Sequence, residues 1–221
     1  MKYKAIIFDM DGTIINSEEC WAQATLHLLM NKCNLSEKEA LTFLPQFKGA
    51  SSYSSCTFIK MAFQPKESIE QLIKEKDHYV FNNFAKLITF IKGFESFHKK
   101  ITRLNIATAI ATNAHQTALN KIKENVPLDQ FFKEHIYCID QVNKKAKPLP
   151  DVYLYAAQQL NIDPKDCIAI EDSSHGVAAA KAASMFCIGI NSGNDRQALH
   201  QADLIVDHYD EIDLNKIPYH Q

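Results

Sequence analysis

The amino-acid sequence predicts an α/β fold, in which helices cover both faces of a parallel β-sheet. Two observations carry this prediction. Short and nearly continuous apolar runs recur along the chain, as expected of strands buried on both faces, and helical patterns separate most of them. One long segment after the first of these runs shows helical patterns alone. We therefore expect a three-layer core that is interrupted by an all-helical domain.

The strands are expected where the apolar runs occur. These runs are Ala5–Phe8, Ile106–Ala111, Ile136–Ile139, Cys167–Ile170, Phe186–Ile190 and Leu204–Val206. A helix is expected from Asp151, directly after Pro150, because apolar residues follow at helical spacing as far as Leu160. An alanine-rich stretch from Gly176 to Ala183 predicts another helix. Strands that alternate with helices in this way favour a parallel sheet.

The helical segment extends from about residue 16 to residue 90 and contains no convincing strand. Ser36 and Glu39 have the spacing of a capping box, and Asn16 with Glu19 resembles another. A third, longer helix is indicated by apolar residues at helical spacing, namely Ile69, Leu72, Ile73, Val80 and Phe84. The serine run Ser51–Ser55 is expected to be an exposed loop.

Two domains follow from this organisation. Residues 1–15 and 91–221 are expected to form the α/β core, and residues 16–90 an inserted helical cap domain. Since the insertion begins after the first strand, the cap should lie as a lid over the carboxyl edge of the sheet, where open α/β sheets bind their ligands.

Two acids follow the first strand directly, in the run Asp9-Met10-Asp11-Gly12-Thr13. Side chains two residues apart on an extended chain point the same way, so Asp9 and Asp11 should face one small volume while Met10 turns toward the core. Like charges this close require a cation or a shared proton, and Mg²⁺ is the usual cation for oxygen ligands. The simpler alternative is a turn with two solvated acids.

Three further strand ends carry polar groups. Thr112 and Asn113 follow the second strand just before a helix, and a helix N-terminus with such groups is typical of a phosphate site. Lys147, beside a stiff proline, would point an ammonium at an anion. Glu171 and Asp172 are a second pair of acids at a strand-to-helix turn. Each piece alone also fits a helix cap, a solvated lysine or a capping turn, but together at one sheet edge they would collect a divalent cation and a phosphate.

This pattern resembles the haloacid dehalogenase superfamily, in its phosphatase and phosphomutase branch, over nearly the whole chain. The run from Asp9 to Thr13 is similar to the first motif of that family, Thr112 to the second, Lys147 to the third and Glu171-Asp172 to the fourth. The longer runs Lys147-Pro148-Leu149-Pro150-Asp151-Val152-Tyr153 and Glu171–Val177 are highly specific to the subfamily with an inserted helical cap. The resemblance implies a Rossmann-like core and a capped hydrolase.

The resemblance also implies a role for each of these residues. Asp9 would be the nucleophile that forms an aspartyl-phosphate, and Asp11 the general acid and base. Mg²⁺ would be held by Asp9, the backbone carbonyl of Asp11 and Asp172, with Glu171 in support through water. The residues that would bind the phosphate oxygens are Thr112, Asn113 and Lys147.

The cap should select the substrate. Relatives of the β-phosphoglucomutase type place a histidine where this chain has Trp21, and an arginine shortly after a lysine-glycine pair, where Lys48-Gly49 is followed by no arginine. Both absences favour a phosphatase that acts on a small phosphorylated metabolite such as a sugar phosphate, with a β-phosphoglucomutase-like sugar phosphomutase as the alternative. The candidate substrate contacts in the cap are Glu18, Trp21 and Lys48. Trp21 also fits a packing role, and Lys48 fits a solvated one.

Composition narrows the remaining classes. The net charge is -2 and no long basic block occurs, which argues against nucleic acid as a partner. No apolar run approaches the length of a membrane span. The 6 cysteines are scattered and are expected to be reduced thiols, so we expect a cytoplasmic protein. We also expect a monomer. Asp11 argues against a metal-free dehalogenase, which would lack this second acid. A signalling receiver is also disfavoured, because its phosphate acceptor lies on a later strand and no helical segment is inserted after its first strand.

Overall fold

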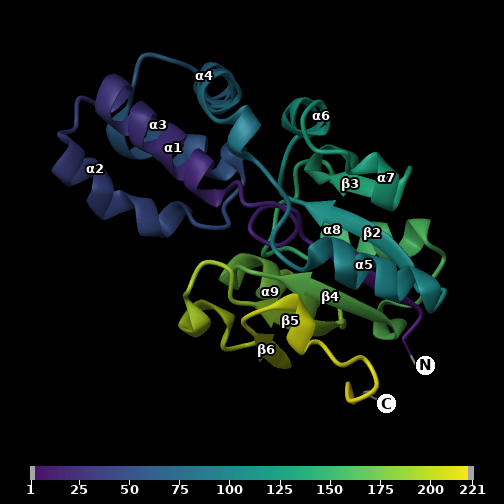
Figure 1. Ribbon diagram of the computed structural model, residues 1–221. Coiled ribbons are helices and arrows are strands. Elements are labelled where there is room, and N and C mark those ends of the chain that lie inside the picture. The colour runs from purple at the N-terminus through teal and green to yellow at the C-terminus, as the bar shows by residue number, and fades with distance from the viewer. Residues whose placement is uncertain (1–2, 219–221) are drawn as a thin grey trace.

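The computed structural model describes residues 3–218 and contains a six-stranded parallel sheet (Figure 1). The strands lie in the order β3-β2-β1-β4-β5-β6, and every neighbouring pair is parallel. Their bounds are β1 Ala5–Phe8, β2 Ala107–Thr112, β3 Ile136–Cys138, β4 Cys167–Glu171, β5 Phe186–Ile190 and β6 Leu204–Val206. The predicted α/β fold with a Rossmann-like sheet is therefore confirmed, and the apolar runs locate each strand to within one residue at either end.

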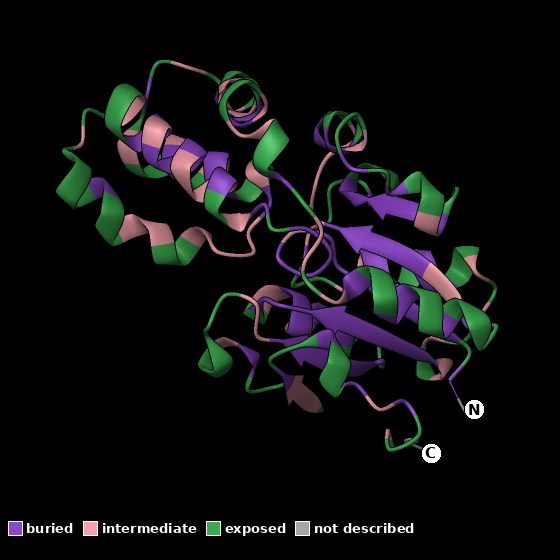
Figure 2. Cartoon of the chain, viewed as in Figure 1, coloured by how far each residue is buried: buried purple, intermediate pink, exposed green. Residues whose placement is uncertain are grey.

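Helices cover both faces of the sheet. Alternate residues of β1 point to opposite faces, so Phe8 packs with Phe94 and Phe132 on one face, whereas Ile7 packs with Tyr153 on the other. Figure 2 shows the strands buried almost throughout and the outer sides of the helices exposed. The helices on the first face are α5 (Phe94–Arg103), α6 (Gln116–Lys123) and α7 (Asp129–Phe132), and those on the second are α8 (Asp151–Gln159) and α9 (Ser174–Ala182).

The remaining α-helices lie between β1 and β2 in the chain and pack on one another, to one side of the sheet (Figure 1). They are α1 (Glu18–Cys33), α2 (Glu37–Phe43), α3 (Ser52–Phe63) and α4 (Ile69–Asn83). These helices enclose an apolar cluster separate from those of the sheet, with Leu28, Ile59 and Leu72 among its buried members. We call this segment, residues 16–90, the cap.

Two chain segments connect the cap to the sheet, and they pair with each other. The backbone N–H of Asn16 donates to the carbonyl of Thr89 at 3.0 Å, and the N–H of Ile91 donates to the carbonyl of Ile14 at 2.8 Å. The Asn16 side chain accepts from the N–H of Thr89 at 2.7 Å. The two connections between the cap and the sheet therefore run side by side.

Two local predictions in the cap are wrong. The serine run is the start of α3 and not a loop, because the Ser51 side chain caps the helix by accepting from the N–H of Ser54 and the buried Ser55 hydroxyl donates to the Ser51 carbonyl. Asn16 does not cap α1, because its side chain is bonded to Thr89 instead. The capping box of Ser36 and Glu39 at α2 is confirmed.

Short 3-10 helices complete the described chain, and one of them, η1, borders the cavity described below. They are η1 (Leu44–Phe47), η2 (Ala85–Leu87), η3 (Ile139–Val142), η4 (Pro164–Asp166), η5 (Arg196–Leu199) and η6 (Tyr209–Glu211). Within residues 3–218, no helix is both long enough and apolar enough to cross a membrane.

His98 on α5 should make the stability of the core depend on pH. The residue is 6% exposed, and 5.0 Å separate the centres of its ring and the Phe132 ring. Burial lowers the pKa of His98 to about 4, from an ordinary value of 6.5. Because the unfolded chain then binds the proton more tightly, the free energy of unfolding should fall as the pH drops from about 6.5 toward 4, by roughly 2 kcal/mol between pH 7 and pH 5.

Urea unfolding at pH 7 and at pH 5 measures this effect. His98→Leu should remove most of the difference, while His200→Leu, at an exposed position, should keep it. Equal pH dependence in the wild type and in His98→Leu would contradict the assignment.

Candidate active site

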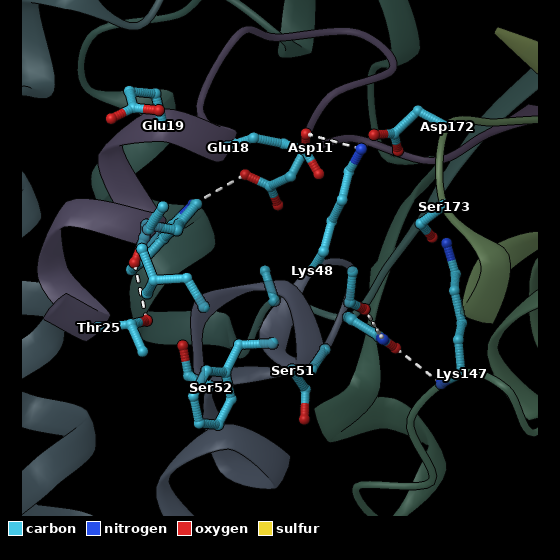
Figure 3. A pocket seen from close by; sticks show the side chains of 18 of the residues that line it. Asp11, Glu18, Glu19, Thr25, Lys48, Ser51, Ser52, Lys147, Asp172 and Ser173 are labelled. Carbon is cyan, nitrogen blue, oxygen red and sulfur yellow. Dashed lines mark hydrogen bonds and ion pairs between the residues drawn. The ribbon is translucent and has the colours of Figure 1, made fainter. Parts of the chain in front are cut away.

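The carboxyl ends of three adjacent strands bring the predicted site residues together. Asp9 follows β1, Thr112 ends β2 and Asp172 follows β4, and these strands are neighbours in the sheet. A cavity of about 480 Å³ lies between this edge and the cap and is lined by residues of both. Figure 3 shows Asp11, Glu18, Lys48 and Asp172 along one side of this cavity.

Lys147 ties two of the acids together. Its ammonium Nζ lies 2.5 Å from Asp9 Oδ1 and 2.6 Å from Glu171 Oε1, and the residue is 4% exposed. Burial alone would lower the pKa of Lys147, but the carboxylates of Asp9 and Glu171 raise it above its ordinary value. Its backbone N–H donates to Asn113 Oδ1 at 2.8 Å, which holds the loop in place. The result is a fixed cation beside the predicted nucleophile.

Glu171 is buried, and protein donors occupy both of its carboxylate oxygens. Lys147 and the Tyr153 hydroxyl donate to Oε1, at 2.6 Å and 2.8 Å. The N–H groups of Asp172 and Ser173 and the Ser173 hydroxyl donate to Oε2, at 3.1, 3.4 and 3.2 Å. Glu171 therefore acts as an anchor for Lys147 and for the turn after β4. Tyr153 belongs to a motif noted in the sequence, but its hydroxyl contact was not foreseen.

Asp172 has the features of a metal ligand. Its Oδ2 is buried without a hydrogen-bond partner in the described chain, and oxygens of Asp9, Glu171 and Asp172 lie within 4.8 Å of one another. Burial, together with the neighbouring acids, raises the pKa of Asp172 well above its ordinary value. A methyl group on Gly12 would come within 2.2 Å of Asp172 Oδ2, so only glycine permits this approach. A hard divalent cation such as Mg²⁺ fits these donors and would offset their charge.

Asp11 is held by the cap and lies outside that group of oxygens. The Ser17 hydroxyl and the Trp21 indole N–H both donate to Asp11 Oδ1, the latter at 3.0 Å. Burial raises the pKa of Asp11, and these two hydrogen bonds lower it only in part. A carboxyl that keeps its proton more readily is suited to general acid catalysis.

Trp21 combines packing with this polar contact. Its ring meets Phe81 edge-on, with 5.9 Å between the ring centres, and it also lines the cavity. The sequence indicated the packing role, but it carried no signal for the N–H contact, because that contact depends on how α1 docks beside Asp11.

Thr112 and Asn113 line the cavity, but they do not open a helix. The next helix, α6, begins three residues after Asn113 and is capped by His115, so Thr112 and Asn113 precede a helix but do not form its N-terminus or its cap. The Thr112 hydroxyl accepts from the N–H of Ala114 at 3.0 Å. The Asn113 amide donates to the carbonyl of Gly49 in the cap at 3.2 Å. Asn113 therefore connects the cap to the sheet edge.

The three cap candidates all line the cavity. Glu18 and Lys48 form a loose pair, with 3.9 Å between Oε2 and Nζ, and neither side chain is more than about a third exposed. Lys48 is therefore less exposed than a fully solvated surface lysine would be.

Lys76 on α4 is a cavity residue that the sequence reasoning missed. It is 4% exposed, and its ammonium lies 5.9 Å from the centre of the Trp21 ring. Burial lowers the pKa of Lys76. No carboxylate of the described residues forms an ion pair with it. Its spacing offered a signal, because it lies four residues after Leu72 and four before Val80 on the buried side of α4.

Comparison with known proteins identifies this arrangement of motifs. The family model described as haloacid dehalogenase-like hydrolase matches residues 6–190. Hexitol phosphatase A of Escherichia coli is 29% identical, over 99% of this chain and 97% of its own length. The β-phosphoglucomutase of Bacillus subtilis is 27% identical, over 96% and 92%. A crystal structure of a hydrolase of this family from Entamoeba histolytica superposes with a TM-score of 0.82 at 23% identity, over 96% of both chains.

Proposed function

We propose that the chain, which belongs to the haloacid dehalogenase-like hydrolase family, is a Mg²⁺-dependent phosphatase of a small phosphorylated metabolite, in particular a phosphorylated carbohydrate. The observation that carries the proposal is the contact of Lys147 with Asp9, beside the unpartnered oxygen of Asp172. These three residues would supply a carboxylate nucleophile, a cation for a phosphate oxygen and a metal ligand within one buried site.

The reaction would proceed in two displacements. The Asp9 carboxylate attacks phosphorus, the bond from phosphorus to the ester oxygen breaks, and Asp11 gives that oxygen its proton. Asp11, now ionised, takes a proton from a water molecule. The hydroxide so formed attacks the phosphorus of the aspartyl-phosphate, which releases inorganic phosphate and restores Asp9. The raised pKa of Asp11 suits its first task.

The remaining core residues would bind and position the phosphoryl group. Asp9 and Asp172 would hold Mg²⁺, with the Asp11 backbone carbonyl and Glu171 in support. When bound, Mg²⁺ supplies positive charge that offsets the phosphate and the acids. Lys147 would shift part of its contact from Asp9 to a phosphate oxygen. Thr112 and Asn113 would complete the phosphate-binding set.

Hydrolysis is expected to prevail over isomerisation. The relatives include both a phosphatase and a mutase, but this chain has Trp21 in place of the cap histidine and no arginine after Lys48-Gly49. With β-glucose 1-phosphate and Mg²⁺, inorganic phosphate should appear faster than glucose 6-phosphate when both are followed together. Faster formation of glucose 6-phosphate would favour the mutase.

Trp21→Phe is expected to lower kcat by about tenfold to a hundredfold with little change in KM. Phenylalanine retains an aromatic ring but lacks the indole N–H. Asp11 therefore loses a charge-assisted hydrogen bond, worth about 1.5–3 kcal/mol. Steady-state kinetics provide the measurement. Phe81→Leu is the control, since it changes the ring contact and keeps the N–H donor. If both variants lose kcat equally, the hydrogen bond is not what positions Asp11.

A cytoplasmic location is part of the proposal. It is supported by the 6 cysteines, all of which are free thiols in the structure.

A further inference from the structure

The cavity has two chemically different sides. The side at the sheet edge carries the acids and Lys147, whereas the far wall is formed by the end of α2 and by η1. The side chains of that wall offer no hydrogen-bonding group, and they are Leu41, Leu44, Pro45 and Phe47. We infer that the substrate is the phosphate ester of an amphipathic alcohol, with polar groups near the phosphate and an apolar end against this wall. The inference rests on the proposed phosphatase function.

The far wall does not suit an alcohol with hydroxyls along its whole length. Each hydroxyl placed against these side chains would lose its hydrogen bonds to water without replacement. Of the three cap hydroxyls that line the cavity, those of Thr25 and Ser51 are already engaged within the protein, and that of Ser52 lies at the start of α3, outside this wall. Thr25 donates to the Trp21 carbonyl at 2.9 Å, and Ser51 bonds to Ser54 at 2.9 Å. Figure 3 shows Thr25 and Ser51 on the side of the cavity away from Asp172.

Polar recognition is instead concentrated near the reacting end. Glu18 and Lys48 lie next to the acids, and the buried ammonium of Lys76, which has no carboxylate partner among the described residues, lies over the Trp21 ring that contacts Asp11. These groups can bind a hydroxyl or carbonyl close to the phosphate. A cavity of about 480 Å³ also has room for an organic group beyond the phosphate.

Leu41 makes the wall testable. It is 48% exposed and is absent from the apolar cluster of the cap, so its side chain is free to be covered by a ligand. Leu104, at the end of α5 and outside the cavity, is a matched control at 50% exposed. Leu41→Ser and Leu104→Ser therefore remove the same side chain at equal exposure, one inside the cavity and one outside it.

The experiment compares two esters with the same six-carbon chain, 1,2-hexanediol 1-phosphate and hexitol 6-phosphate, by kcat/KM for phosphate release with Mg²⁺. The diol ester keeps a hydroxyl beside the phosphate and has an apolar end. We expect it to be preferred by about tenfold or more. Leu41→Ser should lower this preference by about tenfold, and Leu104→Ser should leave it unchanged. Circular dichroism confirms that both variants fold.

The outcomes separate this inference from the proposed function. If hexitol 6-phosphate is the better substrate and Leu41→Ser does not change the ratio, the inference is overturned while the phosphatase stands. If neither ester nor any sugar phosphate releases phosphate, both proposals fall.

Discussion

Replacing Asp9 with asparagine is expected to reduce phosphate release by more than about 10⁴-fold, since loss of the nucleophile removes the covalent route altogether. The amide has nearly the same shape as the carboxylate, but it cannot form an aspartyl-phosphate. Its oxygen can still accept from Lys147, which lies 2.5 Å from Asp9 Oδ1, so the fold should survive. Steady-state assay of inorganic phosphate measures the loss, and circular dichroism checks the fold.

A second readout separates the nucleophile from a merely structural acid. In the wild type, beryllofluoride with Mg²⁺ should form an adduct on Asp9 that mimics the phosphorylated carboxylate, and Asp9→Asn should not form it. Asp213→Asn, which changes a surface acid far from the cavity, should behave as the wild type in both measurements. Wild-type turnover by Asp9→Asn would end the proposed mechanism.

The core could be predicted from the sequence because its strands are buried on both faces. The run Ala5–Phe8 has no polar residue to alternate with, and Asp9 follows it directly, where the strand reaches the sheet edge. The same reasoning placed Asp172 beside Asp9, because both follow strands that proved to be neighbours. Functional residues that directly follow buried strands can therefore be predicted from the local sequence pattern.

Contacts between the cap and the core could not be predicted in this way. Trp21 reaches Asp11, and Asn113 reaches the Gly49 carbonyl, only because the cap docks as it does. Periodicity specifies which side of a helix is buried, but not which residue of another segment it meets. Lys76 illustrates this limit. Its spacing on α4 indicated a buried position, but a lysine side chain is usually solvated, and the structure shows it buried.

The start of α3 was missed for a different reason. Serine favours loops because its hydroxyl competes for backbone hydrogen bonds, yet the same property makes Ser51 a helix cap and lets Ser55 bond to the preceding turn. Composition alone does not distinguish these uses.

Removing Mg²⁺ with a chelator is expected to abolish turnover, and Asp172→Asn should cause the same loss while making the metal-free protein more stable. Asp172 Oδ2 is buried without a partner, and its neighbours are acids, so the ionised group is costly when no cation offsets it. The amide of asparagine is uncharged, and its N–H groups can donate to the neighbouring acids, so relief of a cost of about 1–3 kcal/mol should raise Tm by roughly 3–9 °C. Ca²⁺ should restore activity poorly, because its coordination is looser and larger.

Thermal unfolding with and without Mg²⁺ tests this prediction without relying on activity. The wild type should gain stability as Mg²⁺ is added, by mass action, whereas Asp172→Asn should start from a higher Tm and show no such gain. Trp21 is the single tryptophan of the chain and bonds to Asp11, so its fluorescence provides an independent titration. Asp213→Asn should respond to Mg²⁺ like the wild type. If Mg²⁺ stabilises Asp172→Asn as much as the wild type, the Asp172 carboxylate is not needed for Mg²⁺ binding. The ion would then bind elsewhere.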